Sequence, residues 1–372
     1  MFRPHAVRWL FAGLLAGLTA AAVQADIVIG QTAGFTGSVA ASVKETAEGA
    51  KLHLDAVNAK GGVNGQRIVL VSLDDRFDPK LAAGNARSLI VEHKAVALFL
   101  TRGTPHAQAI LPVLTEHKVP LIAPSTGAMV LHQPVDPYVF NVRTPYQREA
   151  EHAVRHLGLI GLTRIAVLHT DDSFGADLVA GVNKGFATGA SKPLWVEKFS
   201  RDKPDFTALA KKVVQSDAQA VVFIGSGTTV ADGTKALRAA GSRAQIVTMS
   251  NNAAGGFVKS MGEHARGTIV SQVFPSERLM STAIVKEAAA LAQGRGIELS
   301  PAMMEGFAGA KVLVEGLRRA GPNPTSASLT AALNGLRNFD LGGMALSYGP
   351  ADHTGLDFVD LSIVGADGRF MR

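Results

Sequence analysis

The sequence predicts an α/β protein built from two similar lobes, and three observations support this fold class. The 372 residues are enough for about two domains of ~100–200 residues each. Short apolar runs typical of buried strands alternate with helical patterns along the chain, and the alternation restarts once. A hydrophobic content of 47%, against 18% charged residues, suits packed cores and excludes a disordered chain.

The first 25 residues have the pattern of an export signal. Arg3 and Arg8 precede an apolar stretch at 9–18, and small residues then lead to a cleavage site near Ala25. The apolar stretch is shorter than the ~20 residues that a membrane-spanning helix needs. We therefore expect a mature periplasmic protein that begins near Asp26 and is not embedded in a membrane.

Composition excludes several classes of function. The chain has no cysteine, which excludes disulfides, thiolate metal sites and a lipid anchor on cysteine. The export signal holds two arginines and no acid, so removing it lowers the formal net charge from +6 to +4. No basic cluster interleaved with aromatic residues is present, and nucleic acid is therefore not an expected partner.

Each block of the chain predicts a parallel sheet with helices on both faces. In the first block, Thr104 is expected as a helix N-cap with Pro105 at the first helical position. The first block predicts strands at 26–30, 68–73, 95–100 and 120–123, and helices at 39–58, 79–93 and from 104 onward. The second predicts strands at 164–168, 194–199, 220–224 and 245–249, and helices at 145–157, 174–187, 205–215 and 229–240. The remainder predicts helices at 282–294 and 301–318 and one more strand at 358–364.

Catalytic motifs in the chain are incomplete. The glycine-rich segment 30–37 follows a strand but lacks the spacing of a nucleotide-binding loop. The segment 225–227 lacks the flanking glycines of a nucleophile elbow. His152 and His156 lie four residues apart, yet Ala153 stands where a metalloprotease helix carries glutamate. The sequence therefore predicts no catalytic residue, no metal site and no cofactor.

Polar loops follow several predicted strands and enter the next helix. Ligands of open α/β sheets bind beyond the carboxyl ends of the strands, and helix starts attract anions such as carboxylates. Each loop could equally serve only to cap its helix, but their recurrence in both blocks favours a shared cleft between the lobes. The loops are 34–37, 102–104, 125–127, 171–175 and 250–252.

Several segments, taken in order along the mature chain, carry a resemblance to one family. They are 27–37, 57–68, the acids Asp74-Asp75 followed by Asp78-Pro79, and the segments 123–128, 171–175, 338–343 and 358–361. Together they resemble the branched-chain amino-acid type of periplasmic binding protein. The resemblance implies two Rossmann-like lobes, the type I fold, with an interlobe cleft and three hinge crossings.

The resemblance also implies how the chain divides between the lobes. By analogy the crossings lie near 141–144, 272–275 and 346–349. The first lobe would then comprise 26–142 and 274–347, and the second 143–273 and 348–372.

The implied function is that of a non-enzymatic, monomeric solute receptor. Its lobes would close on a small carboxylate, an amino acid of the branched-chain or a related kind, and deliver it to a membrane permease of an ABC importer. The implied ligand-binding residues are Phe35, Arg102, Gly103, Thr104, Ser125, Thr126, Gly127, Phe174, Gly225, Asn251 and Asn252.

Four of these positions depart from the amino-acid binders of the family. Phe174 stands where tyrosine is common, and Gly225 stands where a second aromatic often follows the strand. Asn251 and Asn252 lie in a loop that often supplies an acid for the ligand's ammonium group, and asparagine cannot neutralise a buried cation. An aromatic or short aliphatic acid or an amide therefore stays open as the ligand. A ligand-sensing receptor, or an enzyme on a similar fold, stays open as the function.

Overall fold

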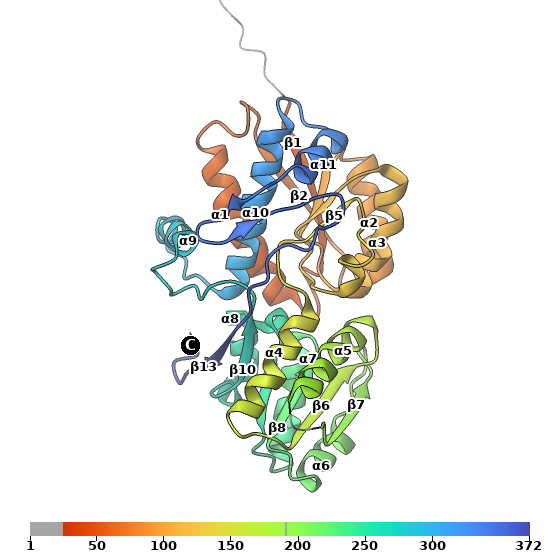
Figure 1. Cartoon of the computed structure of the whole chain (residues 1–372), viewed down its shortest axis with the longest axis vertical. Coiled ribbons are helices and arrows are strands. Elements are labelled where there is room, and N and C mark those ends of the chain that lie inside the picture. The colour runs from red at the N-terminus through yellow and green to blue at the C-terminus, as the bar shows by residue number, and fades with distance from the viewer. Residues whose placement is uncertain (1–24, 190–191) are drawn as a thin grey trace, which may run out of the picture.

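The computed structural model describes residues 25–189 and 192–372 as two lobes, each with its own sheet (Figure 1). Both lobes are α/β, so the predicted fold class is confirmed. Apart from its last position, the export signal predicted at 1–25 lies outside the described residues. Within the described part of the chain, no helix is long and apolar enough to cross a membrane.

The first lobe contains a five-stranded parallel sheet in the order β2-β1-β3-β4-β5. Its apolar strands are covered on both faces, as parallel sheets require. The strands are β1 (Ile27–Ala33), β2 (Ile68–Asp74), β3 (Ala97–Phe99), β4 (Leu121–Ile122) and β5 (Val139–Phe140). The helices of this part are α1 (Ala40–Asn58), α2 (Pro79–Val91) and α3 (Thr104–His117).

The second lobe contains a seven-stranded sheet in the order β14-β13-β10-β9-β8-β6-β7. The last two strands of the chain, β13 and β14, are antiparallel to their neighbours, so this sheet is mixed rather than parallel throughout. The strands are β6 (Ile165–Thr170), β7 (Trp195–Phe199), β8 (Ala220–Ile224), β9 (Gln245–Thr248), β10 (Ile269–Gln272), β13 (Asp360–Val364) and β14 (Phe370–Met371). The helices are α4 (Tyr146–Leu159), α5 (Ser173–Thr188), α6 (Thr207–Gln215), α7 (Gly227–Ala239) and α8 (Gly255–Met261).

After β10 the chain returns to the first lobe. There α10 packs along α1 at very short range, because a glycine on each helix removes the side chain between them. A Cβ at Gly306 would lie 1.8 Å from the carbonyl oxygen of Thr46, and one at Gly49 would lie 2.0 Å from that of Met303. The returning elements are α9 (Ala283–Gln293), α10 (Pro301–Ala320), α11 (Ser326–Asn334), β11 (Phe339–Asp340) and β12 (Ala345–Leu346).

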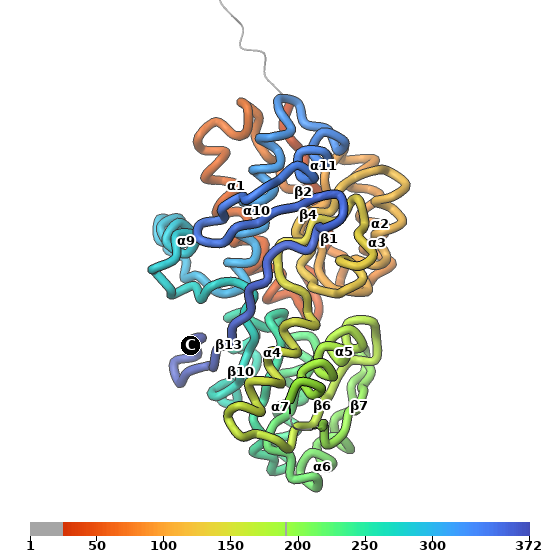
Figure 2. The backbone as a smooth tube through the Cα atoms, in the orientation of Figure 1, coloured from red at the N-terminus to blue at the C-terminus, as the bar shows by residue number. Residues whose placement is uncertain are grey.

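The backbone passes between the lobes three times (Figure 2). The first pass follows Val142 and the second lies at 272–273, since Val142 and Val273 belong to the first-lobe core. The third lies between Leu356 and β13, later than the expected 346–349, because Leu356 still packs in the first-lobe core. The first and third passes lie side by side, and the amide of Leu356 donates to the carbonyl of Val142 at 3.0 Å.

The sequence prediction missed seven strands and α-helices and misplaced one cap. It did not include α8, α11, β5, β10, β11, β12 or β14, which are short or lie where the apolar pattern is broken by polar residues. The N-cap of α3 is Gly103, at φ +98°, and Thr104 is the first helical residue. The hydroxyl of Thr104 is therefore available for another contact.

Buried titratable groups make the stability of the first lobe depend on pH. The His106 and His132 side chains are 0% and 2% exposed, and their ring nitrogens have no hydrogen-bond partner among the described residues. Burial lowers the pKa of both imidazoles to about 4. Burial has the opposite effect on Asp75, whose pKa it raises to about 6.

We predict that the free energy of unfolding falls as the pH is lowered from about 6.5 to about 4. In this window the two histidines are protonated in the unfolded chain but not in the folded protein. Each histidine therefore lowers the free energy of unfolding by about 1.4 kcal/mol for every pH unit of acidification. Below about pH 6, protonation of Asp75 stabilises the folded state, because its pKa is raised there. This gain cancels the loss of unfolding free energy from about one of the two histidines. Urea unfolding at several pH values should therefore give a shallower dependence for His132→Gln than for the wild type. An identical dependence would contradict the assignment.

Candidate functional site

Loops from both lobes enclose a small pocket. Its walls lie close together and leave about 20 Å³ of free space, room for about one water molecule, so a larger ligand enters only when the lobes move apart. The first lobe contributes Val39, Phe77, Arg102, Gly103 and Thr104, and the chain beyond the first crossing contributes Tyr146, Phe174, Arg201, Ser226 and Asn251.

Arg102 is a buried cation that reaches from the first lobe to the second. It follows β3 and bridges to Ser125 after β4, which continues the strand pairing beyond the strand ends. Its Nη1 donates to the Ser125 hydroxyl at 3.0 Å, and its Nη2 donates to the carbonyl oxygen of Asn251 at 2.6 Å and to the Ser42 hydroxyl at 3.4 Å. The residue is only 4% exposed, and its partners within the described residues are all neutral. Nε and one Nη1 hydrogen remain available to a ligand.

Two threonine hydroxyls meet beside this guanidinium. The Oγ1 atoms of Thr104 and Thr126 lie 2.9 Å apart, and the two residues are 1% and 0% exposed. Thr104 opens α3, whose first backbone N–H groups have no partner within the helix. Hydroxyls, helix start and guanidinium together form a donor-rich corner suited to a carboxylate.

Aromatic rings and a second arginine form another wall of the pocket. The rings of Tyr146 and Phe174 meet edge to face with centroids 5.2 Å apart. The Arg201 guanidinium lies 5.0 Å from the centroid of Phe77 and 5.9 Å from that of Phe174. Asp172 pairs with Arg201 and also accepts from the amide of Gly175 as the N-cap of α5, so it fixes the arginine against the rings.

Asn251 presents an acceptor that has no partner. Its side-chain Nδ2 donates to the carbonyl oxygen of Gly225 at 2.9 Å and to the Oδ1 of Asn252 at 3.1 Å, which defines the orientation of the amide. Its Oδ1 is buried and has no hydrogen-bond partner among the described residues. Because Asn251 lines the pocket, this oxygen is an acceptor for a donor group on a ligand.

The structure brings only part of the predicted site into the pocket wall. Arg102, Gly103, Thr104, Phe174 and Asn251 line it. The other predicted residues lie behind or beside this wall. In the first lobe, the Ser125 hydroxyl binds Arg102, the Thr126 hydroxyl binds that of Thr104, and Phe35 packs near Val39. The carbonyl of Gly127 accepts from the amide of Tyr146. In the second lobe, the carbonyl of Gly225 accepts from both asparagine side chains, and Asn252 also donates to Thr248.

The sequence analysis missed five wall residues. Phe77 lies in the turn between β2 and α2, and Arg201 follows β7, so both belong to strand-end loops that the search did not include. Tyr146 stands at the start of α4, immediately after the first crossing, and Ser226 is the N-cap of α7. Val39 immediately precedes α1. Considering every strand end, rather than five polar loops, would have included Phe77 and Arg201.

A buried ionic cluster supports the pocket from the side of the crossings. Arg143 is 1% exposed, pairs with Glu149 of α4 and donates to the Ser250 hydroxyl at 2.6 Å. Its guanidinium lies 4.5 Å from the ring centroid of Tyr146 and 3.8 Å from a carboxylate oxygen of Glu305 in α10. Burial opposes the charge of Arg143, but the carboxylate of Glu149 more than offsets this and raises the pKa of the guanidinium. The cluster therefore fixes the pocket wall at Tyr146.

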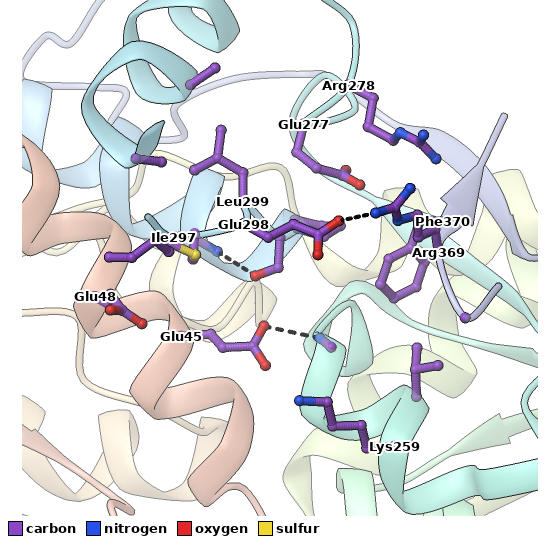
Figure 3. Close-up of a pocket in the computed structure, with 18 of the residues that line it drawn as sticks. Glu45, Glu48, Lys259, Glu277, Arg278, Ile297, Glu298, Leu299, Arg369 and Phe370 are labelled. Carbon is purple, nitrogen blue, oxygen red and sulfur yellow. Dashed lines mark hydrogen bonds and ion pairs between the residues drawn. The ribbon is translucent and has the colours of Figure 1, made fainter. Parts of the chain in front are cut away.

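A second, much larger groove opens between the lobes (Figure 3). Its free volume is about 1230 Å³, and its carboxylates outnumber its cationic groups, so it does not offer a carboxylate the environment that Arg102 does. The charged residues that line it are Glu45, Glu48, Glu277, Glu298, Asp367, Lys259, Arg278 and Arg369. The described residues contain no group of three metal-ligating side chains, here or elsewhere.

Glu45 joins the lobes across this groove. Its carboxylate accepts from the backbone amides of Gly255 and Gly256 at 3.0 and 2.8 Å, so a side chain of α1 binds the start of α8 (Figure 3). Anionic groups stabilise helix starts, which makes this a favourable contact between the lobes. Nearby, Glu298 and Arg369 form an exposed ion pair at 3.0 Å, which contributes little.

Comparison with known proteins gives consistent matches along the chain. A family model described as "Periplasmic binding protein" matches residues 26–362. A protein named Leu/Ile/Val-binding protein homolog 3, from Brucella melitensis, is 25% identical over 321 residues, which cover 85% of each chain. An amino acid binding protein from Pseudomonas aeruginosa is 29% identical over 205 residues, or 54% of each chain.

Solved structures match over nearly the whole described chain. A substrate-binding periplasmic protein from Ralstonia solanacearum has a TM-score of 0.86 at 30% identity, over 93% of this chain and 99% of that one. A branched chain amino acid ABC transporter from Thermus thermophilus with bound valine has a TM-score of 0.82 at 17% identity, and the match covers 94% of this chain and 95% of that one. The second match shows a shared fold.

We predict that Glu45→Ala shifts the lobes toward a more open arrangement. The variant loses two charge-assisted hydrogen bonds between the lobes, and such bonds contribute about 1.5–3 kcal/mol each when intact. The closed form should therefore lose about tenfold or more in relative population. Small-angle X-ray scattering should record a larger radius of gyration than for the wild type.

Glu48→Ala is the matched control, since Glu48 lies one turn further along α1 and also lines the groove. Its carboxylate has no hydrogen bond to the second lobe within the described residues, and its removal should leave the scattering unchanged. Equal radii for the wild type and Glu45→Ala would show that the contact does not hold the lobes together.

Proposed function

The chain belongs to the periplasmic binding protein family, as the sequence resemblance predicts, and from this we propose that it is an exported receptor for a small carboxylate. Its lobes close on the ligand and present the closed form to a membrane permease of an ABC importer. It acts in the periplasm as a monomer, after removal of the export signal near Ala25, and it catalyses no reaction.

One observation carries the ligand assignment. The buried guanidinium of Arg102 lines the interlobe pocket, has no acidic partner among the described residues and keeps two N–H donors available. A buried charge without a counter-ion is costly, and an incoming carboxylate would remove that cost. The paired hydroxyls of Thr104 and Thr126 add donors at the same corner.

The names of relatives indicate which ligands to test first. Relatives include a Leu/Ile/Val-binding protein homolog and an amino acid binding protein, so branched-chain and other amino acids belong in any panel. The pocket wall carries no acid for an ammonium group, which favours aromatic or aliphatic acids as the second candidates.

A thermal-shift screen tests the receptor function directly. The panel contains amino acids, aromatic acids, short aliphatic acids, dicarboxylates and the corresponding amides. A binder stabilises the folded protein by about 2.7 kcal/mol at a hundredfold excess over its dissociation constant. At least one carboxylate should raise the melting temperature, while its neutral amide should not. No shift with any carboxylate, or saturable hydrolysis of an ester or amide, would overturn the proposal.

We predict that the double variant Thr104→Ala with Thr126→Ala loses affinity for the best carboxylate of that screen by about tenfold or more. The Thr104 hydroxyl, which Thr126 orients, would no longer bond to the carboxylate, and a bond to a charged group contributes roughly 1.5–3 kcal/mol. The melting temperature of the empty protein should change little, because the hydroxyls bond to each other and both are removed together. Thr115→Ala, in an exposed part of α3, is the control and should bind as the wild type does. Wild-type affinity in the double variant would remove both threonines from the site.

A further inference from the structure

The charge balance of the interlobe pocket discriminates among carboxylate ligands. Its wall includes two guanidinium groups, those of Arg102 and Arg201, and no carboxylate among the described residues. Asp172 neutralises Arg201. Arg102 has only neutral partners, so the pocket carries one uncompensated positive charge.

Three buried or half-buried acids behind the pocket wall face arginines, and the buried Asp75 accepts from the backbone amide of Phe77. Glu149 pairs with Arg143, and Glu305 lies 3.8 Å from the same guanidinium. Asp172 pairs with Arg201. None of these three lines the pocket. An ammonium group in the pocket would therefore face the uncompensated guanidinium of Arg102, and no acid lines the wall beside it.

We propose that the ligand is a small carboxylic acid that lacks an ammonium group, in preference to the zwitterionic amino acid of the same skeleton. The inference rests on the receptor function proposed above and selects among its ligands. An acid of charge −1 neutralises Arg102, whereas a zwitterion brings a cation into the pocket together with its carboxylate. Desolvating that cation without a counter-ion is unfavourable, and repulsion from the guanidinium of Arg102 adds to the cost.

The remaining wall suits the rest of such a molecule. The rings of Phe77, Tyr146 and Phe174 offer apolar surface to a hydrocarbon body. The unpartnered Oδ1 of Asn251 accepts a hydrogen bond, and a neutral hydroxyl or amide N–H on the ligand would satisfy it.

Matched pairs of ligands test the proposal in the wild-type protein. Isothermal titration calorimetry compares L-leucine with 4-methylpentanoate and L-phenylalanine with 3-phenylpropionate, which differ only by the ammonium group. We expect the acid of each pair to bind at least about tenfold more tightly, which is the effect of one unfavourable charge interaction of modest size. Equal or tighter binding of both amino acids overturns this inference and leaves the receptor function standing. Absence of binding by all acids and amino acids of the wider panel overturns the receptor function itself.

A new acid in the pocket wall should reverse the preference. Ser226 lines the pocket as the N-cap of α7, a position that accepts aspartate readily. Ser226→Asp should therefore shift the affinity ratio within each pair toward the amino acid by about tenfold or more. Thr228→Asp adds the same charge two residues further on, at an exposed position outside the pocket, and should leave the ratio unchanged.

Asn251→Asp provides a second variant if Ser226→Asp does not fold. It replaces the unpartnered amide oxygen with a carboxylate at nearly the same place. A ratio that moves toward the amino acid in either variant, with Thr228→Asp unchanged, supports the proposal. An unchanged ratio in the folded variants overturns it.

Discussion

The arrangement of the two lobes depends on one buried cation at the first crossing. Arg143 holds Glu149 and Ser250 of the second lobe, faces Glu305 of the first, and lies over the ring of Tyr146 in the pocket wall. Removing a single partner from such a buried network leaves an uncompensated charge and is strongly destabilising. The network therefore couples the geometry of the crossing to the geometry of the pocket.

Two buried arginines in this region differ in how their charges are neutralised, and the difference indicates that one is structural and that the other is suited to binding a ligand. Arg143 is neutralised within the protein, and its role is complete without a ligand. Arg102 is almost as buried but has only neutral partners, one of them a carbonyl oxygen of the opposite lobe. A stable fold does not require a buried charge to stay unpaired, and under the proposed function the ligand carboxylate supplies the counter-charge of Arg102.

Much of the fold could be predicted from the sequence, because buried parallel strands and amphipathic helices leave local patterns. The strands β1, β2, β7 and β8 fall within a few residues of their predicted positions. The third crossing could not be placed, since whether Leu356 packs in one lobe or the other depends on contacts with distant segments. The mixed character of the second sheet escaped prediction for the same reason, because direction of pairing leaves no periodic signal in a single strand such as β13.

The site was less predictable than the fold because its key contacts join residues far apart in the chain. Loops after strands identified Arg102, Thr104 and Asn251, but not which side of each loop faces the pocket. Asn251 and Asn252 are identical in type and adjacent, yet only the first lines the pocket, since the amide of the second is held by Gly225 and Thr248.

Closure and ligand binding share a single group in this structure. The Nη2 of Arg102 binds the carbonyl of Asn251 across the lobes, and the same residue lines the pocket. Closing the lobes without an anion removes water from Arg102 and offers only dipoles in return, whereas closing them with an anion supplies a counter-charge. In the proposed receptor, the closed form therefore binds an anion more tightly than the open form does, and a ligand shifts the lobes only through that difference. The same uncompensated charge thus favours ligand binding and disfavours closure of the empty protein.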